Sequence, residues 1–194
     1  MVVGVLALQG GFEAHQSALE QLGVSSAQVR TPEELGLVDA LIIPGGESTT
    51  MLKLVDEEGL RDSIVHYQKP MLGCCAGSIL MASEVTRPEQ ECLRLLDIAV
   101  ERNAYGRQVH SGIRNVVPGE EFGRRTLRRD VEAVFIRAPI IRRLGEGVTA
   151  LLEYEGNPIL VESGSRLAAT FHPELTADRR VQSLLLDKIR SNAQ

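Results

Sequence analysis

Short apolar runs recur along the first half of the chain, with helical patterns between them. One run, DALII at 39–43, ends in Pro-Gly-Gly, and a similar run occupies residues 2–8. Side chains alternate between the two faces of a sheet, so a run without polar interruption belongs to a strand buried on both faces. Helices between such strands form right-handed βαβ units. The sequence therefore predicts a three-layer α/β/α sandwich around a mostly parallel central sheet.

The patterns place the individual elements as follows. Strands are expected at residues 2–8, 26–30, 39–43, 69–72, 98–101, 113–117, 131–136, 148–154, 158–162 and 166–170, with a hairpin turn at 155–158. Helices are expected at residues 12–22, 60–67 and 180–191. A further helix is expected to begin at a cap, Ser48 or Thr49, and to run to about residue 60, and another is expected to start at residues 77–83. The chain contains no linker, repeat or low-complexity stretch, and we expect one domain over residues 1–194.

Charge and cysteine content exclude several classes of function. The formal net charge is −5, whereas a nucleic-acid binder needs a basic surface, and residues 2–8 are too short to span a membrane. One basic run, RRTLRR at 124–129, is either a solvated face or a contact patch for a partner or a phosphate. The cysteines, Cys74, Cys75 and Cys92, include no CxxC pair and are odd in number, which argues against zinc and disulfides. We therefore expect a cytoplasmic protein with a functional thiol and no metal.

The most informative motif is GCCAG at 73–77, directly after an expected apolar strand. It has the strand, G-x-nucleophile-x-G, helix form, with Cys75 in the nucleophile position. A nucleophile on such a sharp turn has strained backbone angles, so its neighbours must be as small as Gly73 and Gly77. The turn also places Cys75 at a helix N-terminus, which favours a thiolate. The alternative is that both cysteines are small buried hydrophobic residues, a role that we assign to Cys74 alone.

A cysteine nucleophile needs a base that forms an ion pair with it and protonates the leaving amine. Among four histidines, only His172 follows an expected strand, in the segment HPEL. The next residue, proline, keeps His172 out of helical geometry, and in an extended chain Glu174 would share its face and orient the imidazole. Thiol, imidazole and carboxylate then form a triad. We place His15 and His66 on solvated helix surfaces and leave His110 unassigned.

The segment PGGESTT at 44–50 follows another buried strand. Its two glycines let the backbone turn N–H groups into a cleft, as an oxyanion hole requires. One backbone N–H donor would lie near Gly46, and the N–H of Ala76, next to the nucleophile, would be the second. Glu47 at the rim can hold a cationic α-amino group. The alternative is a plain glycine turn before a helix.

Together these motifs resemble class I glutamine amidotransferases. PGGEST at 44–49, GCCAG at 73–77 and FHPEL at 171–175 match the oxyanion loop, the nucleophile turn and the His-Glu motif of that class. Three further blocks are similar to the glutaminase family of pyridoxal 5′-phosphate synthase (the PdxT/SNO family): LALQG at 6–10, ERNAYGRQ at 101–108 and FIRAP at 135–139. All six blocks keep their order, so the resemblance covers nearly the whole chain.

The resemblance implies roles for particular residues. Cys75, His172 and Glu174 would be the triad that hydrolyses L-glutamine to L-glutamate and ammonia. The residues that would contact glutamine are Gly46, Glu47, Ser48, Arg102, Ile136 and Arg137. Independently of the resemblance, the guanidinium of Arg102 suits an α-carboxylate. Gln9 would help to organise the oxyanion loop when a separate synthase subunit of the PdxS type docks to receive the ammonia, and no cofactor is implied.

The sequence departs from the family pattern at three places outside the triad. Cys74 stands where threonine is usual, Cys92 stands where glycine is common, and HSGI at 110–113 replaces an acidic residue followed by Ser-Phe-Glu. Two alternative functions stay open. One is a glutaminase subunit that serves another acceptor synthase, such as one for imidazole-glycerol phosphate, although the 101–108 block speaks against it. The other is a non-catalytic regulatory subunit of the same fold.

Overall fold

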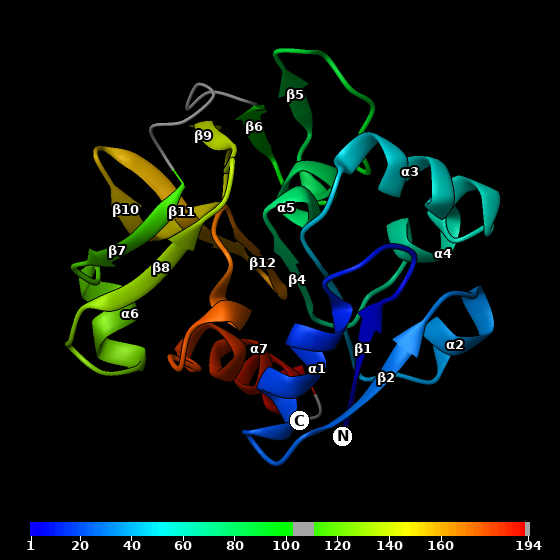
Figure 1. Ribbon diagram of the computed structural model, residues 1–194, viewed down its shortest axis with the longest axis horizontal. Coiled ribbons are helices and arrows are strands. Elements are labelled where there is room, and N and C mark those ends of the chain that lie inside the picture. Colours follow the sequence, from blue (N-terminus) through cyan, green and yellow to red (C-terminus); the bar gives the residue numbers. More distant parts are fainter. Residues whose placement is uncertain (103–110, 193–194) are drawn as a thin grey trace.

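The computed structural model describes residues 1–102 and 111–192 of the chain. Its largest sheet has seven strands in the order β10–β11–β12–β4–β3–β1–β2 (Figure 1). The strands of this sheet are β1 Val2–Leu6, β2 Ser25–Val29, β3 Ala40–Ile43, β4 Met71–Cys74, β10 Thr149–Tyr154, β11 Asn157–Ser163 and β12 Arg166–Ala169. Strands β2, β1, β3, β4 and β12 pair in parallel, and β11 and β10 continue the sheet antiparallel. The predicted mostly parallel central sheet is confirmed.

Different helices cover the two faces of this sheet. The helices are α1 Phe12–Glu20, α2 Pro32–Gly36, α3 Ser48–Glu57, α4 Arg61–Val65, α5 Ala76–Met81, α6 Glu120–Arg125, the 3₁₀ helix η1 Pro173–Leu175 and α7 Arg180–Asn192. Strand β3 shows the arrangement best, because Leu41 and Ile43 pack with residues of α2 to α5 while Ala40 and Ile42 pack with residues of α1 and α7. All four side chains are fully buried. The predicted three layers and the doubly buried strand are therefore present.

Two smaller sheets stand beside the β10–β11–β12 edge. One contains β5 Glu84–Thr86, β6 Ile98–Glu101 and β9 Ile140–Leu144, and the other pairs β7 Gly112–Val116 with β8 Val131–Phe135. The predicted hairpin at 155–158 joins β10 to β11. The elements α2, β5, α6, β9 and η1 were not predicted. They are three to six residues long, too short for a hydrophobic period to reveal them.

Two further sequence observations have a structural counterpart. In the basic run 124–129, Arg124 is exposed and pairs with Glu121, while Arg125 pairs with Glu162, which fits a solvated face. In the described part of the chain, no helix combines the length and apolar character needed to cross a membrane.

Gly77 sets how closely α5 approaches β3. A Cβ atom at this position would collide with the backbone carbonyl group of Ile43. Because a backbone group in a central strand cannot move aside, any larger residue must push the helix away from the sheet.

We predict that Gly77→Ala lowers the free energy of unfolding by about 2 kcal/mol or more, because it overpacks the interior. Urea denaturation of the two proteins measures the difference. Gly36→Ala is the matched control, since a Cβ at Gly36 meets no atom within 4 Å, and its midpoint should stay close to that of the unmodified chain. Equal midpoints for both variants would contradict the prediction.

Candidate active site

Cys75 lies in the sharp turn between β4 and α5. Its backbone angles are φ 49° and ψ −105°, outside the usual regions for an L-residue. A Cβ at Gly73 would lie 2.6 Å from the carbonyl oxygen of Gly77, so this turn cannot hold larger neighbours. Cys75 is 7% exposed, whereas Cys74 is fully buried among the residues under α1 and α7. The strained turn and the packing role of Cys74 are as predicted.

His172 follows β12, the parallel neighbour of β4. Ala169 in β12 pairs with Cys74, and the backbone N–H of Cys75 donates to the carbonyl oxygen of Ala169 at 2.8 Å. Both strands therefore end at the same edge of the sheet, where Cys75 is near enough to raise the pKa of the His172 imidazole and its Sγ lies 3.9 Å from the carbonyl oxygen of Ile136. The structure thus brings together two residues that are 97 positions apart in the sequence.

Glu174 contacts His172, the predicted base. Its Oε1 lies 2.7 Å from Nδ1 of His172, and both side chains are buried. The conformation of this segment differs from the extended one that we predicted, because Pro173–Leu175 forms the 3₁₀ helix η1. Proline is favoured at the first position of a helix, where it needs no N–H partner. The predicted contact is present, but a tight helical turn makes it.

The triad is electrostatically coupled. Burial lowers the pKa of His172, but its contacts with Cys75 and Glu174 outweigh this effect and raise the pKa to about 10. Burial raises the pKa of Glu174, yet the hydrogen bond from His172 and the electrostatic interactions with His15 and His172 bring it below its ordinary value. At neutral pH the pair is therefore an imidazolium next to a carboxylate, which can act as an acid toward a leaving group.

A small pocket of about 90 Å³ opens beside Cys75. It is lined by Gly46, Glu47, Ser48, Cys75, Ala76, Ile79, Arg102, Ile136, Arg137 and Pro139. Every residue predicted to contact glutamine or to contribute to the oxyanion hole is among them. The sequence interpretation missed Ile79 and Pro139, although Ile79 lies one helical turn after Ala76 and Pro139 ends the FIRAP block.

Glu47, rather than Ser48 or Thr49, caps helix α3. Its carboxylate accepts hydrogen bonds from the backbone N–H groups and the hydroxyl groups of Thr49 and Thr50. Burial would raise the pKa of Glu47, but these bonds lower it to about 2. The predicted Ser48 or Thr49 cap is therefore wrong, because the carboxylate of Glu47, one position earlier, reaches two of the free N–H groups of the first turn.

Two side chains hold Glu47 and its loop in place. The amide of Gln9 accepts a hydrogen bond from the Glu47 backbone N–H at 3.1 Å and donates one to its carbonyl oxygen at 3.3 Å. Nη2 of Arg102 lies 3.2 Å from Oε1 of Glu47. Gly45 lies against His172, since a Cβ there would stand 2.5 Å from Cε1 of the ring. The glycine loop, Gln9 and the triad thus form one continuous site.

His15 is not solvated, contrary to our prediction. It is fully buried, and its Nε2 lies 3.6 Å from Oε2 of Glu174. Its burial could have been inferred from the helical spacing, because His15 lies three and four positions before Ala18 and Leu19, which also point inward from α1. His66 is exposed as predicted. His110 and most of the 101–108 block lie outside the described residues.

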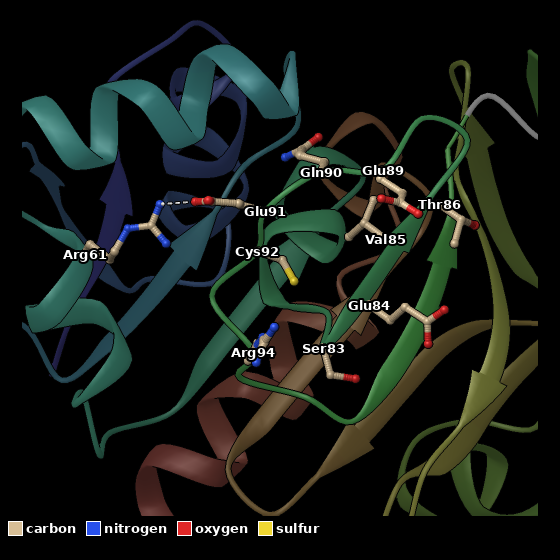
Figure 2. Close-up of a pocket in the computed structure, with 10 residues that line it drawn as sticks. All are labelled: Arg61, Ser83, Glu84, Val85, Thr86, Glu89, Gln90, Glu91, Cys92 and Arg94. Carbon is tan, nitrogen blue, oxygen red and sulfur yellow. Dashed lines mark hydrogen bonds and ion pairs between the residues drawn. The ribbon is translucent and has the colours of Figure 1, made fainter.

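A larger hollow of about 670 Å³ lies on another part of the surface (Figure 2). It is lined by Arg61, Ser83, Glu84, Val85, Thr86, Glu89, Gln90, Glu91, Cys92 and Arg94, none of which was predicted to act in catalysis. A hydrogen bond links its wall to that of the pocket beside Cys75: the hydroxyl of Ser48, in the pocket, donates to Oε1 of Gln90, in the hollow, at 2.7 Å. We place the candidate active site at the strained Cys75 rather than at this hollow, whose size alone indicates no chemistry.

The fold and the site define a glutamine amidotransferase. A crystal structure of a glutamine amidotransferase has a TM-score of 0.88 and 44% identity, and the match covers 98% of this chain and all of the other. A glutamine amidotransferase from Thermotoga maritima has a TM-score of 0.60 at 16% identity, covering 99% of this chain and 84% of that one, and so shares the fold.

Sequence comparison defines the family more closely. The model of the SNO glutamine amidotransferase family matches residues 5–191. The chain is 55% identical to pyridoxal 5′-phosphate synthase subunit PdxT of Solibacter usitatus over 189 residues, covering 96% of this chain and 98% of the relative. Identity to the subunit of the same name from Koribacter versatilis is 47%, covering 98% and 97%. The chain belongs to the SNO glutamine amidotransferase family.

We predict that the imidazole of His172 stays protonated well above its ordinary pKa of 6.5, up to about pH 10. The stability that this proton contributes is fully present below about pH 6.5 and is lost as the pH rises toward 10. NMR titration of ¹³C-labelled histidine measures the midpoint. Glu174→Gln should lower it, whereas Glu153→Gln, on an exposed carboxylate, should leave it unchanged. An unshifted midpoint in Glu174→Gln would refute the coupling.

Proposed function

We propose that this chain is the glutaminase subunit of a pyridoxal 5′-phosphate synthase. It hydrolyses L-glutamine to L-glutamate and ammonia, and a separate synthase subunit receives the ammonia. The observation that carries the proposal is the placement of Cys75 and His172 after two paired strands, β4 and β12, beside a pocket that contains all the residues expected to contact glutamine. The family membership and the names of the close relatives support the same function. We further propose that residues 1–194 act as one glutaminase domain.

The first half of the reaction forms a thioester. The thiolate of Cys75 attacks the side-chain amide carbon of glutamine, and backbone N–H groups at Gly46 and Ala76 stabilise the oxyanion. The N–H of Ala76 is available because the first N–H groups of a helix have no partner within it. His172 then gives its proton to the departing ammonia, while Glu174 holds the ring in orientation.

The second half releases glutamate. His172, now neutral, takes a proton from water, which attacks the thioester carbon, and the sulfur of Cys75 leaves as thiolate. At the rim of the pocket, Arg102 binds the α-carboxylate of glutamine and Glu47 binds the α-amino group. These two side chains already form an ion pair, so a zwitterionic amino acid complements both charges.

The proposal includes a docked partner and a cytoplasmic location. Gln9 holds the loop next to Gly46 through the backbone of Glu47, so a partner that contacts Gln9 can adjust the oxyanion donors. The three cysteines are unpaired, as is usual in a reducing compartment.

We predict that Cys75→Ala lowers the rate of glutamine hydrolysis by about 10³-fold or more, because the covalent intermediate can no longer form. Glutamate release is measured with a pyridoxal 5′-phosphate synthase subunit present. Cys92→Ala is the matched control, since Cys92 lies outside the pocket, and it should keep normal activity. Full activity in Cys75→Ala would remove this residue from the mechanism. If only a different synthase activated glutamine hydrolysis by the unmodified chain, that synthase would be the ammonia acceptor.

We also predict that Arg102→Lys raises the KM for glutamine about 10-fold with little change in kcat, because an ammonium cannot donate two parallel hydrogen bonds to the α-carboxylate as a guanidinium does. Steady-state kinetics with the synthase subunit measure both constants. Arg143→Lys provides the control, as its guanidinium pairs with Asp97 on another part of the surface. An unchanged KM in Arg102→Lys would show that Arg102 does not bind the substrate.

A further inference from the structure

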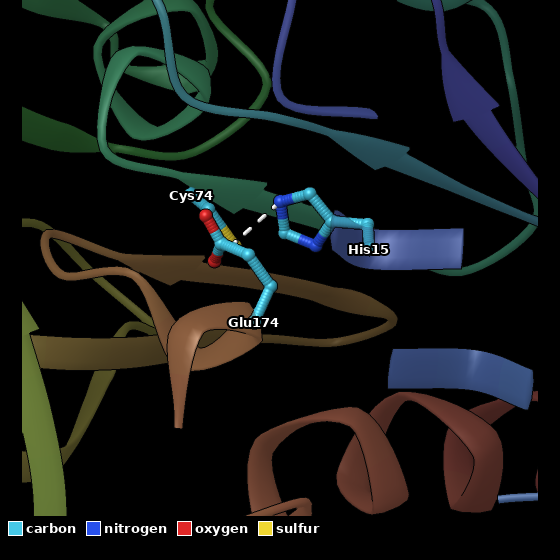
Figure 3. A group of neighbouring side chains, drawn as sticks. All are labelled: His15, Cys74 and Glu174. Carbon is cyan, nitrogen blue, oxygen red and sulfur yellow. Dashed lines mark ion pairs between the residues drawn. The ribbon is translucent and has the colours of Figure 1, made fainter. Parts of the chain in front are cut away.

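His15 is a buried polar side chain that the triad does not explain. It projects from α1 toward Glu174 and Cys74 (Figure 3), and none of its surface is exposed. Among residues 1–102 and 111–192, neither ring nitrogen has a hydrogen-bond partner, and Oε2 of Glu174 also lacks one. A buried polar atom left without a partner destabilises the folded state. A small apolar residue would fill this position without that cost, so a histidine here needs a reason.

The unpartnered atoms of the two residues face each other. Glu174 lies between two imidazoles: its Oε1 is 2.7 Å from Nδ1 of His172, and its Oε2 is 3.6 Å from Nε2 of His15. A carboxylate can accept at both oxygens. The distance on the His15 side is slightly longer than a hydrogen bond, and catalytic hydrogen bonds are often long in a free enzyme and tighten when the substrate binds.

We propose that His15 is a positioning residue of the active site, which donates from Nε2 to Oε2 of Glu174 and thereby holds this carboxylate against His172. This inference rests on the proposed glutaminase function. It extends the chain of contacts from Cys75 through His172 and Glu174 to helix α1. The geometry requires the tautomer of His15 that carries its proton on Nε2.

The charges around His15 agree with such a role. Burial lowers the pKa of His15, and the neighbouring His172 lowers it further, although Glu174 acts in the opposite direction. A neutral His15 can donate one proton without placing a second cation beside the imidazolium of His172. The titratable groups facing Glu174 are His172 from its own segment, His15 from α1, and Cys74 from β4.

The same cluster also has the composition of a metal site, which we consider less suitable. His15, Cys74 and Glu174 offer ligand atoms within 4.8 Å of one another. However, a metal ligand must be a thiolate, and burial, together with the charges of Glu174 and Cys75, raises the pKa of the Cys74 thiol. Glu174 is, in addition, already engaged by His172. A polar network fits these side chains better.

The test compares His15→Leu with His15→Gln in the presence of the synthase subunit. Leucine removes the donor, whereas the side-chain amide of glutamine can place an N–H near the position of Nε2. We expect kcat to fall about 10- to 100-fold in His15→Leu with KM within about twofold, and to recover most of the way in His15→Gln. The acid limb of the kcat–pH profile should move to higher pH in His15→Leu, because the pKa of Glu174 rises.

The matched controls are His66→Leu and His66→Gln, since His66 is exposed and lies at the end of α4. The inference is overturned if His15→Leu keeps normal kcat, or if both His15 variants lose activity equally with an unmoved pH profile, which would indicate packing alone. Failure of the proposed function would look different: the unmodified chain would then release no glutamate that depends on Cys75.

Discussion

Strands β3, β4 and β12 pair in parallel, and this pairing sets the positions of the loops that form the candidate site. Leu41 to Ile43 pair with Met71 to Gly73, and Arg166 to Ala169 pair with Met71 to Cys74, so all three strands end at one edge of the sheet. The glycine loop, the nucleophile and the imidazole each follow directly from one of these ends. Parallel strands need long crossover connections, which is why residues so distant in sequence meet here.

The turn at Cys75 adds strain that this sheet can support. The unusual backbone angles of Cys75 persist because β4 is buried on both faces and α5 packs tightly against β3 at Gly77. The strained turn places the thiol at the mouth of the pocket while Cys74 points into the core. Burial also strengthens the interaction between His172 and Glu174, because water does not screen it. Rigid packing and strong electrostatics thus have the same origin in the doubly covered sheet.

Much of the site could be predicted because its motifs are local. The glycines of GCCAG are needed by the turn itself, and the pocket contains all the residues that the family resemblance implied. The errors concern contacts across the fold. The cap of α3 depends on how Glu47 reaches back to Thr49 and Thr50, and the burial of His15 depends on η1 lying over α1. A polar residue on an inward face is easily assigned to the surface when its buried partner is unknown.

The class of fold, the strained turn and the residue types of the expected triad could be predicted from the sequence, since they follow from hydrophobic pattern, steric size and local chemistry. Two contacts between distant segments appear only in the folded chain: Arg102 with Glu47, and Glu174 with a second imidazole at His15. The physical reason is that strand pairing and helix packing set distances between segments. Hydrogen bonds and ion pairs depend on those distances to within a fraction of an ångström, and no local pattern in the chain encodes them.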